Sequence, residues 1–534
     1  MTRRDQNVES LANLFGRDGL AAAARMGAFD PFLTTARLMG VTMWGPGIGA
    51  LVAASAMRFP TTVAIEDEDG PITYRRLDAA ASSLAGHFRD VAGDGSVGIL
   101  ARNHKGFVLA QVAAERAGVD VVLLSTALPA GRLRDVIERE RISVLVTDDE
   151  FAAVVEAAGN APLVLAAEGD APNSIHILSR QRRMCSPPRR RSELVLLTSG
   201  TTGPPKGARR ANKAAGSDGM GMFLRIPYQT GDTFYAVPPL FHALGLSQST
   251  IALATGSTLI LRRRFDPNQA LEVMTERRIG VLAVVPLMLR RMLDENPGPD
   301  VIPPRIVISS GNVLSGSLAL DWMDRFGDRL YNLYGSTEAA IGTIADPSEL
   351  RLAPGTVGRP PNGVTLAILD RKGMPVPIGR RGRVYISNSM QFSGYTDGSE
   401  RARSGTLLAT GDLGFMDEHG LLHVSGREND MIVTGGENVF PSQVEEVLDQ
   451  HPDVQVSAVV GLPDEEYGQR ITAFVVPRSK RRKVDADELR AFAAENLANF
   501  MVPKAIHVVE ALPMTTTGKV IRHRLAVLGR ADRL

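Results

Sequence analysis

The stretch Thr198-Ser199-Gly200-Thr201-Thr202-Gly203-Pro204-Pro205-Lys206-Gly207 decides how this chain is interpreted. It follows Leu194-Val195-Leu196-Leu197, an apolar run that predicts a short buried strand. Glycines let backbone amides turn toward an anion, hydroxyls add donors and Lys206 adds positive charge, so the stretch predicts a loop around nucleotide phosphates. It is not a Walker A loop, because prolines precede the lysine and Gly207 follows it. The alternative is an ordinary surface turn.

The size and composition indicate a folded protein with more than one domain. The 534 residues exceed what one core usually holds, and 44% hydrophobic with 22% charged residues is typical of globular proteins. The net charge of +1 gives no overall attraction to nucleic acid, so no nucleic-acid partner is expected. The single cysteine, Cys185, excludes an internal disulfide. No apolar signal segment is found near the N-terminus, which predicts a cytoplasmic location.

One uncharged segment bears on the predicted cytoplasmic location, because it suggests contact with a membrane. Residues 38–57 carry no formal charge and are long enough to cross a bilayer. Four glycines and a proline interrupt the segment between residues 40 and 49, which favours a helical hairpin, either buried or touching a membrane. Peripheral membrane association therefore stays open as an alternative to a purely cytoplasmic protein.

The patterning along the chain predicts an α/β fold. Strands at 96–100, 121–125 and 142–147 alternate with helices, which is typical of a parallel sheet covered on both faces. Short strands between Gly- and Pro-rich turns at 357–425 predict a β-rich subdomain, and the remainder predicts a compact α+β unit. We expect a helical extension (1–50), a large N-terminal domain of stacked, mostly parallel sheets plus the β-rich subdomain (51–428), and a small mobile C-terminal domain (429–534).

Further motifs bring together the residue types that a nucleotide site needs. An aromatic ring, a hydroxyl and a carboxylate share the turn Tyr334-Gly335-Ser336-Thr337-Glu338, and another carboxylate follows a glycine in Thr410-Gly411-Asp412. Gly426-Arg427, Thr434-Gly435-Gly436-Glu437-Asn438 and Thr515-Thr516-Thr517-Gly518-Lys519 follow in order. Each motif alone is typical of an ordinary turn, but their combination favours one site.

This set of motifs resembles the adenylate-forming superfamily of acyl-CoA synthetases, luciferases and peptide-synthetase adenylation domains. The resemblance runs from about residue 50 to the C-terminus and is closest to the fatty-acyl-CoA ligases, through Gly435-Gly436-Glu437-Asn438-Val439-Phe440-Pro441. It implies ATP, Mg²⁺ and CoA as cofactors. It also implies that a carboxylic acid is activated to acyl-AMP with release of pyrophosphate, and that the acyl group is then transferred to CoA.

The resemblance also implies a role for each matching residue. Glu338 and Thr198 would bind Mg²⁺, Lys519 would be the catalytic lysine on a moving domain, and His242 would lie near the acyl carboxylate, although a packed core histidine is an equal alternative. The nucleotide and CoA would be held by Thr198, Ser199, Gly200, Thr201, Thr202, Gly203 and Lys206 (phosphates), Thr337 (α-phosphate), Tyr334 and Gly335 with Ser310 and Gly311 (adenine), Asp412 and Arg427 (ribose), and Gly435 and Gly436 (CoA). At the expected hinge, Asn429 stands where the superfamily usually has Asp or Lys.

The predicted activity is that of a fatty-acyl-CoA synthetase. Small residues near the motifs predict a long narrow acyl channel: Gly245, Gly311, Ala339, Ala340 and Gly342. The partners would be a fatty or other apolar acid and CoA, and a homodimer stays open. Two alternatives remain: an acyl-AMP ligase that loads a carrier protein, and a non-catalytic sensor of acyl groups or nucleotides.

Overall fold

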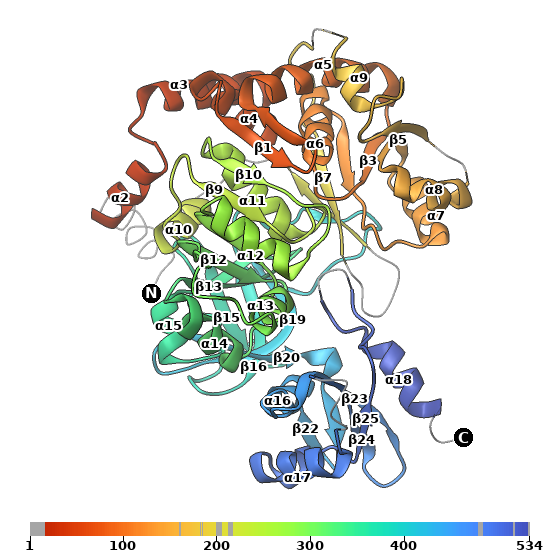
Figure 1. The fold of residues 1–534 in the computed structure, drawn as a ribbon. Coiled ribbons are helices and arrows are strands. Elements are labelled where there is room, and N and C mark those ends of the chain that lie inside the picture. Colours follow the sequence, from red (N-terminus) through yellow and green to blue (C-terminus); the bar gives the residue numbers. More distant parts are fainter. Residues whose placement is uncertain are drawn as a thin grey trace.

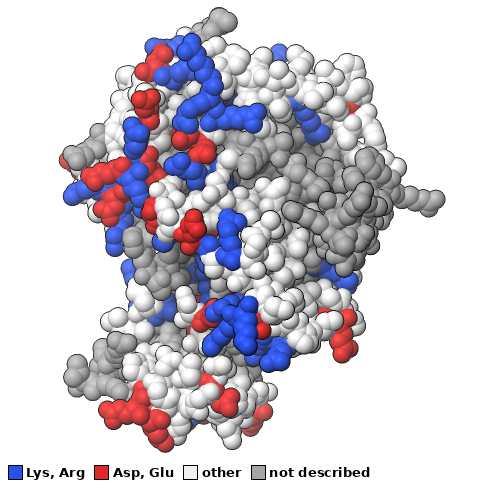
Figure 2. Space-filling model, turned by 180° about the vertical axis from the view of Figure 1, so that it is seen from behind, with Lys and Arg blue, Asp and Glu red and all other residues white. Residues whose placement is uncertain are grey.

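The computed structural model describes residues 17–159, 162–181, 183, 185–198, 206–211, 217–478, 484–515 and 518–531. A large lobe is followed by a smaller C-terminal lobe, which lies below it in Figure 1. Figure 2 shows the opposite side, where basic and acidic side chains are interleaved along one side of the large lobe.

Two large sheets form the centre of the large lobe, and both are parallel except at their edges. One has the order β14-β13-β12-β11-β9-β10-β1-β2, with antiparallel edge strands β14 and β2. Its strands are β14 (Ala340–Ala345), β13 (Leu330–Ser336), β12 (Ile306–Ser310), β11 (Val281–Val284), β9 (Thr233–Ala236), β10 (Thr258–Ile260), β1 (Val63–Asp67) and β2 (Gly70–Thr73). The mostly parallel arrangement confirms the sequence prediction.

The other large sheet has the order β17-β8-β7-β4-β3-β5-β6. Its strands are β17 (Gly394–Tyr395), β8 (Gly207–Ala211), β7 (Glu193–Leu197), β4 (Asp120–Leu123), β3 (Ser96–Leu100), β5 (Ile142–Thr147) and β6 (Leu163–Ala166). Strands β8 and β17 are antiparallel to their neighbours. The sequence prediction matched β3 and β5 over their full lengths.

Helices α5 (Tyr74–Ala92) and α6 (Lys105–Ala117) join the two sheets into one core. Every α6 residue from Gly106 to Ala117 is buried. One hydrophobic cluster contains residues of both helices together with Ile99 of β3 and Phe234 of β9, which belong to different sheets. The other helices of this lobe are α7 (Ala130–Arg139), α8 (Ala152–Ala158), α9 (Ile175–Ser179), α10 (Ser217–Arg225), α11 (Ala243–Ala254), α12 (Pro267–Glu276), α13 (Pro286–Asp294), α14 (Gly316–Phe326) and α15 (Pro347–Leu352).

The β-rich subdomain and the C-terminal lobe each contain a five-stranded sheet. The former consists of β15 (Thr365–Leu369), β16 (Gly382–Ser387), β18 (Arg403–Ser404), β19 (Leu407–Met416) and β20 (Leu422–Arg427). The latter consists of β21 (Ile432–Thr434), β22 (Glu437–Val439), β23 (Val454–Asp464), β24 (Gly468–Pro477) and β25 (Ala505–Val508), with helices α16 (Pro441–Leu448), α17 (Ala486–Asn496) and α18 (Arg522–Ala531). Asn429 lies in the short 3₁₀ turn Glu428–Asp430 between the two sheets.

The N-terminal segment folds into α2 (Arg17–Arg25), α3 (Pro31–Trp44) and α4 (Ile48–Arg58). Helices α3 and α4 form the expected hairpin. Gly40 permits their close packing, because a Cβ there would lie 2.6 Å from the Ala50 carbonyl oxygen. Helix α4 is largely buried, whereas α3, at the outer edge of the large lobe (Figure 1), exposes 76% of Phe32 and 66% of Leu38. In the described part of the chain, no helix combines the length and the apolarity that crossing a membrane requires.

Candidate active site

The predicted phosphate loop lies between β7 and β8, which form an antiparallel pair. Thr198 follows β7, and its N–H donates to the carbonyl oxygen of Lys206 at 2.8 Å, which closes the base of the loop. The predicted phosphate-binding residues between these two positions (Ser199, Gly200, Thr201, Thr202 and Gly203) lie outside the described residues. Lys206 Nζ donates to Ser399 Oγ at 2.8 Å and lies 3.6 Å from an Asp397 carboxylate oxygen.

Glu338 is the buried carboxylate of the site, with 5% of the residue exposed. It follows β13 in a tight turn, where a Cβ on Gly335 would lie 1.9 Å from the Ala340 carbonyl oxygen. Burial acts to raise the pKa of Glu338, but a hydrogen bond from Tyr395 and the charge of Arg401 hold this pKa below its usual value. Glu338 is therefore an anion in a largely dry environment.

The predicted adenine-binding residues lie on neighbouring parallel strands. Ser310 ends β12 and is paired with Leu333 of β13, to whose carbonyl oxygen the Ser310 hydroxyl donates at 2.7 Å. Gly311 follows with a φ of 89°, a conformation that favours glycine. Because the carboxyl ends of parallel strands share one edge of a sheet, Tyr334 lies near this pair, at the edge where such sheets bind ligands.

The predicted ribose-binding pair is brought together by sheet register. Asp412 of β19 is opposite Arg427 of β20, and the Arg427 Nε lies 3.4 Å from Asp412 Oδ1. The Tyr334 hydroxyl donates to Asp412 Oδ2 at 2.6 Å, which connects the predicted adenine and ribose residues. Thr337 lies beside them, and its carbonyl oxygen accepts a hydrogen bond from Arg210 Nη2 at 2.6 Å.

Lys519 reaches this site from the C-terminal lobe. The preceding Gly518 accepts a hydrogen bond on its carbonyl oxygen from Asn312 Nδ2 at 3.3 Å, and a Cβ on Gly518 would lie 2.9 Å from Leu287 Cδ2. The loop therefore docks closely against the large lobe. Burial and the charge of Arg427 lower the pKa of Lys519, while the carboxylates of Asp412 and Glu338 oppose that shift.

His242 lies near Lys519 at the start of α11. Burial and the positive charge of Lys519 lower the pKa of His242 to about 4. The imidazole is thus neutral at physiological pH. This residue belongs to the same site, which favours the functional interpretation over that of a packed core histidine.

Gly435 and Gly436 lie elsewhere, in the turn between β21 and β22 of the C-terminal sheet. Their φ values are 57° and 86°, positive at two successive positions as in hairpin turns that favour Gly-Gly, Asn-Gly or Asp-Gly. The Gly435 N–H donates to the Tyr467 carbonyl oxygen at 2.9 Å. In this arrangement of the lobes the pair is part of the C-terminal hairpin, apart from the sheets that hold the nucleotide residues.

Sequence reasoning missed Tyr395, Arg401 and Arg210, although all three surround Glu338 or its turn. Gly394-Tyr395-Thr396-Asp397-Gly398 has the composition of an ordinary surface turn, and an isolated arginine carries no pattern. The one available signal was the pair of arginines at 209 and 210 directly after the phosphate loop. Charge at that position is unusual for the interior of a strand.

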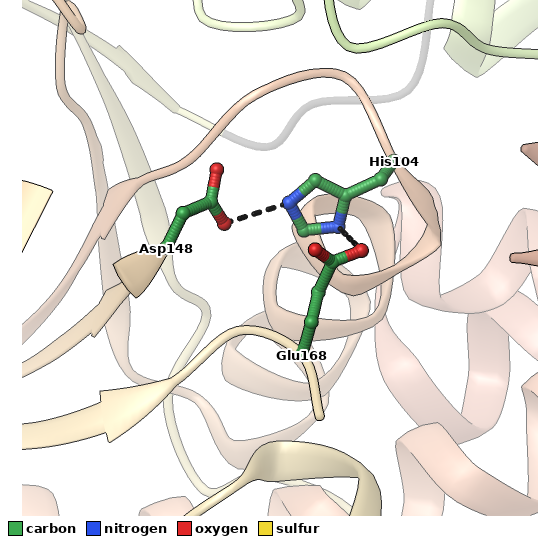
Figure 3. Close-up of side chains that lie close together, drawn as sticks. All are labelled: His104, Asp148 and Glu168. Atoms are coloured by element: carbon green, nitrogen blue, oxygen red, sulfur yellow. Dashed lines mark hydrogen bonds and ion pairs between the residues drawn. The ribbon is translucent and has the colours of Figure 1, made fainter. Parts of the chain in front are cut away.

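A second cluster of titratable residues lies at the carboxyl ends of β3, β5 and β6 (Figure 3). The fully buried His104 ring lies between two carboxylates, with Nε2 2.8 Å from Asp148 Oδ1 and Nδ1 3.1 Å from Glu168 Oε1. The Gly106 N–H donates to the same Nδ1 at 3.1 Å, and Arg263 pairs with Glu168. Both ring nitrogens are thus already engaged, which favours a structural network over a metal centre.

Comparison with known proteins finds similar sequences over most of the chain. The family description "AMP-binding enzyme" matches residues 52–396, and its C-terminal domain matches residues 443–519. The 2-succinylbenzoate–CoA ligase of Bacillus licheniformis is 29% identical over 485 residues, 87% of this chain and 97% of that protein. The feruloyl-CoA synthase of an Amycolatopsis species is 30% identical over 497 residues, 90% of this chain and 98% of that protein.

A solved structure shares the fold over nearly its whole length. The o-succinylbenzoate CoA synthetase of Bacillus subtilis, in complex with its acyl-adenylate intermediate, has a TM-score of 0.79 at 25% identity. The match covers 89% of this chain and 97% of that one. The chain belongs to the AMP-binding enzymes, the adenylate-forming superfamily that its motifs predict.

Proposed function

We propose that this chain is an AMP-forming acid–CoA ligase. The observation that supports the proposal most strongly is that Lys519, from the C-terminal lobe, lies in the electrostatic field of Glu338, Asp412 and Arg427 from the large lobe. A sensor has no need of a lysine delivered by a second lobe. The relatives named above are CoA ligases, and one is bound to an acyl-adenylate, which supports the same assignment.

The reaction would proceed in two steps. A carboxylate oxygen of the acid attacks the α-phosphorus of ATP, the bond to the bridging oxygen breaks, and pyrophosphate leaves. Negative charge then gathers between acid and phosphate, where the Lys519 ammonium is placed to offset it. Tyr334 with Ser310 and Gly311 would hold adenine, and Asp412 with Arg427 would hold the ribose. In the second step the CoA thiolate attacks the acyl carbon and AMP leaves.

The residues present fit a magnesium ion. Mg²⁺ prefers oxygen ligands and usually binds through one or two carboxylates together with substrate phosphates and water. Glu338 supplies a buried anionic carboxylate, and Thr198 supplies a hydroxyl at the base of the phosphate loop. When bound there, the ion would neutralise charge on the phosphate oxygens.

For the acid, we propose a compact apolar carboxylic acid, with aromatic acids favoured over fatty acids. The relatives act on succinylbenzoate and ferulate by their names. The small residues from which a fatty-acid channel was predicted also have another explanation. A Cβ on Gly342 would lie 2.4 Å from Ile386 Cδ1, and one on Gly245 would lie 2.5 Å from the Pro239 carbonyl oxygen. Close packing against the backbone therefore requires a glycine at 245 whether or not a channel exists, and at 342 a larger residue would force Ile386 to move.

The test is a panel of acids scored by ATP-dependent pyrophosphate release, with mass spectrometry of the products formed with CoA. We expect release with at least one aromatic acid, the matching acyl-CoA as product, and release that is slower by a factor of about 10² or more in the Lys519→Ala variant. Release with long-chain acids alone would restore the fatty-acid assignment. An acyl-adenylate that CoA does not discharge, but a carrier protein does, would favour the carrier-loading alternative. No release with any acid would contradict the proposed function.

We further propose that any peripheral membrane contact is made by α3. Its exposed apolar side chains include Phe32, Leu38 and Met39, and its single charged residue, Arg37, is turned inward to the carbonyl oxygens of Met26 and Ala254. These exposed apolar side chains could be buried at the boundary between headgroups and acyl chains, where membrane binding grows with the apolar area buried.

A further inference from the structure

The carboxylate of Glu338 is held by two residues that no motif identified. The Tyr395 hydroxyl donates to Glu338 Oε1 at 2.6 Å, and Arg401 Nη2 lies 3.3 Å from the same oxygen. The Glu338 side chain is 7% exposed and that of Arg401 is 25% exposed, so the pair is largely shielded from water. Because both contacts end on Oε1, they fix the orientation of the carboxylate and direct its other oxygen, Oε2, to a defined place.

Arg401 is itself fixed without help from Glu338. Its Nε donates to the Tyr395 hydroxyl oxygen at 3.1 Å, and its Nη1 donates to the Thr410 carbonyl oxygen at 3.3 Å. Thr410 lies on β19, two residues before Asp412. The guanidinium therefore bridges the predicted metal ligand and the strand that holds the predicted ribose ligand.

Tyr395 is held just as firmly, by the edge of a sheet. Strand β17 pairs with β8, with Tyr395 opposite Ala208, and the Thr396 N–H donates to the Gly207 carbonyl oxygen at 2.8 Å. Lys206 Nζ lies 5.2 Å from the centroid of the Tyr395 ring. One short segment thus contacts both the phosphate-loop lysine and Glu338.

We infer that Tyr395 and Arg401 are positioning residues that orient Glu338 to bind the metal–nucleotide complex. The inference rests on the proposed function, since it takes Glu338 as the metal ligand. Partners that orient a ligating carboxylate usually change metal affinity about 10- to 100-fold when removed. The competing interpretation is that Arg401 is a counter-ion that the metal must displace. The two interpretations predict opposite changes in metal affinity for Arg401→Ala.

The experiment measures Mn²⁺ binding in the presence of ATP by electron paramagnetic resonance, without any acid. The variants are Tyr395→Phe, which removes only the hydroxyl, Arg401→Ala and Arg401→Lys. The matched control is Arg403→Ala, which removes an exposed arginine on β18 two residues away. We expect Mn²⁺ affinity to fall about 10-fold or more in Tyr395→Phe and Arg401→Ala, to recover in part in Arg401→Lys, and to stay unchanged in Arg403→Ala.

Two further measurements make the result decisive. ATP binding without metal and the thermal unfolding midpoint should stay close to the wild-type values in all variants, because a merely structural role would change both. Unchanged or tighter Mn²⁺ binding in Arg401→Ala would overturn the inference, as would equal losses with and without metal. Glu338→Gln should itself lose Mn²⁺ affinity, which tests the metal ligand separately. Failure of the acid panel would contradict the proposed function but would leave this binding test intact.

Discussion

Substitution of Lys519 by alanine should separate the two half-reactions. The ammonium lies in a buried site near the carboxylates of Glu338 and Asp412, on a loop that the docking of Gly518 holds in place. Removing one preorganised donor from such a site typically costs about 10²–10³ in rate, or ~2.7–4 kcal/mol of transition-state stabilisation. Formation of the adenylate should fall by at least this factor.

The second half-reaction should respond differently. If the C-terminal lobe turns after the adenylate forms, Lys519 no longer touches the reacting atoms, and thioester formation from supplied acyl-adenylate and CoA should stay within about threefold of wild type. Both steps are measured by rapid quench. Lys504→Ala, which changes a lysine over the Tyr467 ring in the same lobe, is the matched control. Comparable losses in both half-reactions would refute the reasoning and leave Lys519 as a static residue.

The pH dependence of adenylate formation provides an independent check. Only the protonated lysine offsets negative charge, and burial with the charge of Arg427 lowers its pKa. The rate should therefore decline as pH rises through this lowered pKa, at a lower pH than an ordinary lysine would give. In Lys519→Arg the guanidinium stays protonated, so a residual rate, though reduced by the altered geometry, should not show this decline.

Two other predictions follow from the packing of the lobes and of α3. Gly518→Ala should slow adenylate formation in a stopped-flow assay, because residue 518 has a φ of 74° and a Cβ there would press on Leu287. The control Gly373→Ala should leave the rate unchanged, since residue 373 has a similar φ of 79° but open space around it. Equal rates in the two variants would count against tight docking of the loop. Replacement of Phe32 and Leu38 of α3 by serine should reduce sedimentation with anionic liposomes but leave the activity on a water-soluble acid unchanged. Unaltered sedimentation would exclude α3 as the membrane contact.

Much of the fold follows from local sequence patterns. The apolar runs at Ser96–Leu100 and Ile142–Thr147 are short, continuous and bounded by helical segments, so their identity as buried strands is determined locally. The same holds for Leu194 to Leu197, which form most of β7. The start of α6 has a weaker local signal, because the helix begins at Lys105 with His104 as its N-cap, and histidine is not among the residues preferred at that position.

Sheet order, by contrast, has no local signal, and the missed site residues depend on it. Tyr395 reaches Glu338 because the two-residue strand β17 pairs with β8, which lies nearly two hundred residues earlier in the chain. Two residues are too few for an alternating pattern to be detected. The channel lining predicted from Gly342 and Gly245 stays a prediction, since packing accounts for both glycines as well: Gly342 faces Ile386 of a distant strand, and Gly245 faces the nearby Pro239 carbonyl oxygen.

The relation between His242 and Lys519 decides which of them is the charged partner of the acid. Burial is the main reason why the pKa of His242 falls to about 4, and the charge of Lys519 adds to it. A neutral imidazole offers no positive charge to the carboxylate, so in the proposed reaction that contribution would come from Lys519 rather than from His242. In the proposed reaction His242 would then act through a hydrogen bond. If Lys519 withdraws after the adenylate forms, burial still keeps the imidazole neutral, and a neutral side chain beside the acyl group neither attracts nor repels the incoming thiolate. Its role would be the same in both half-reactions, unlike that of the lysine.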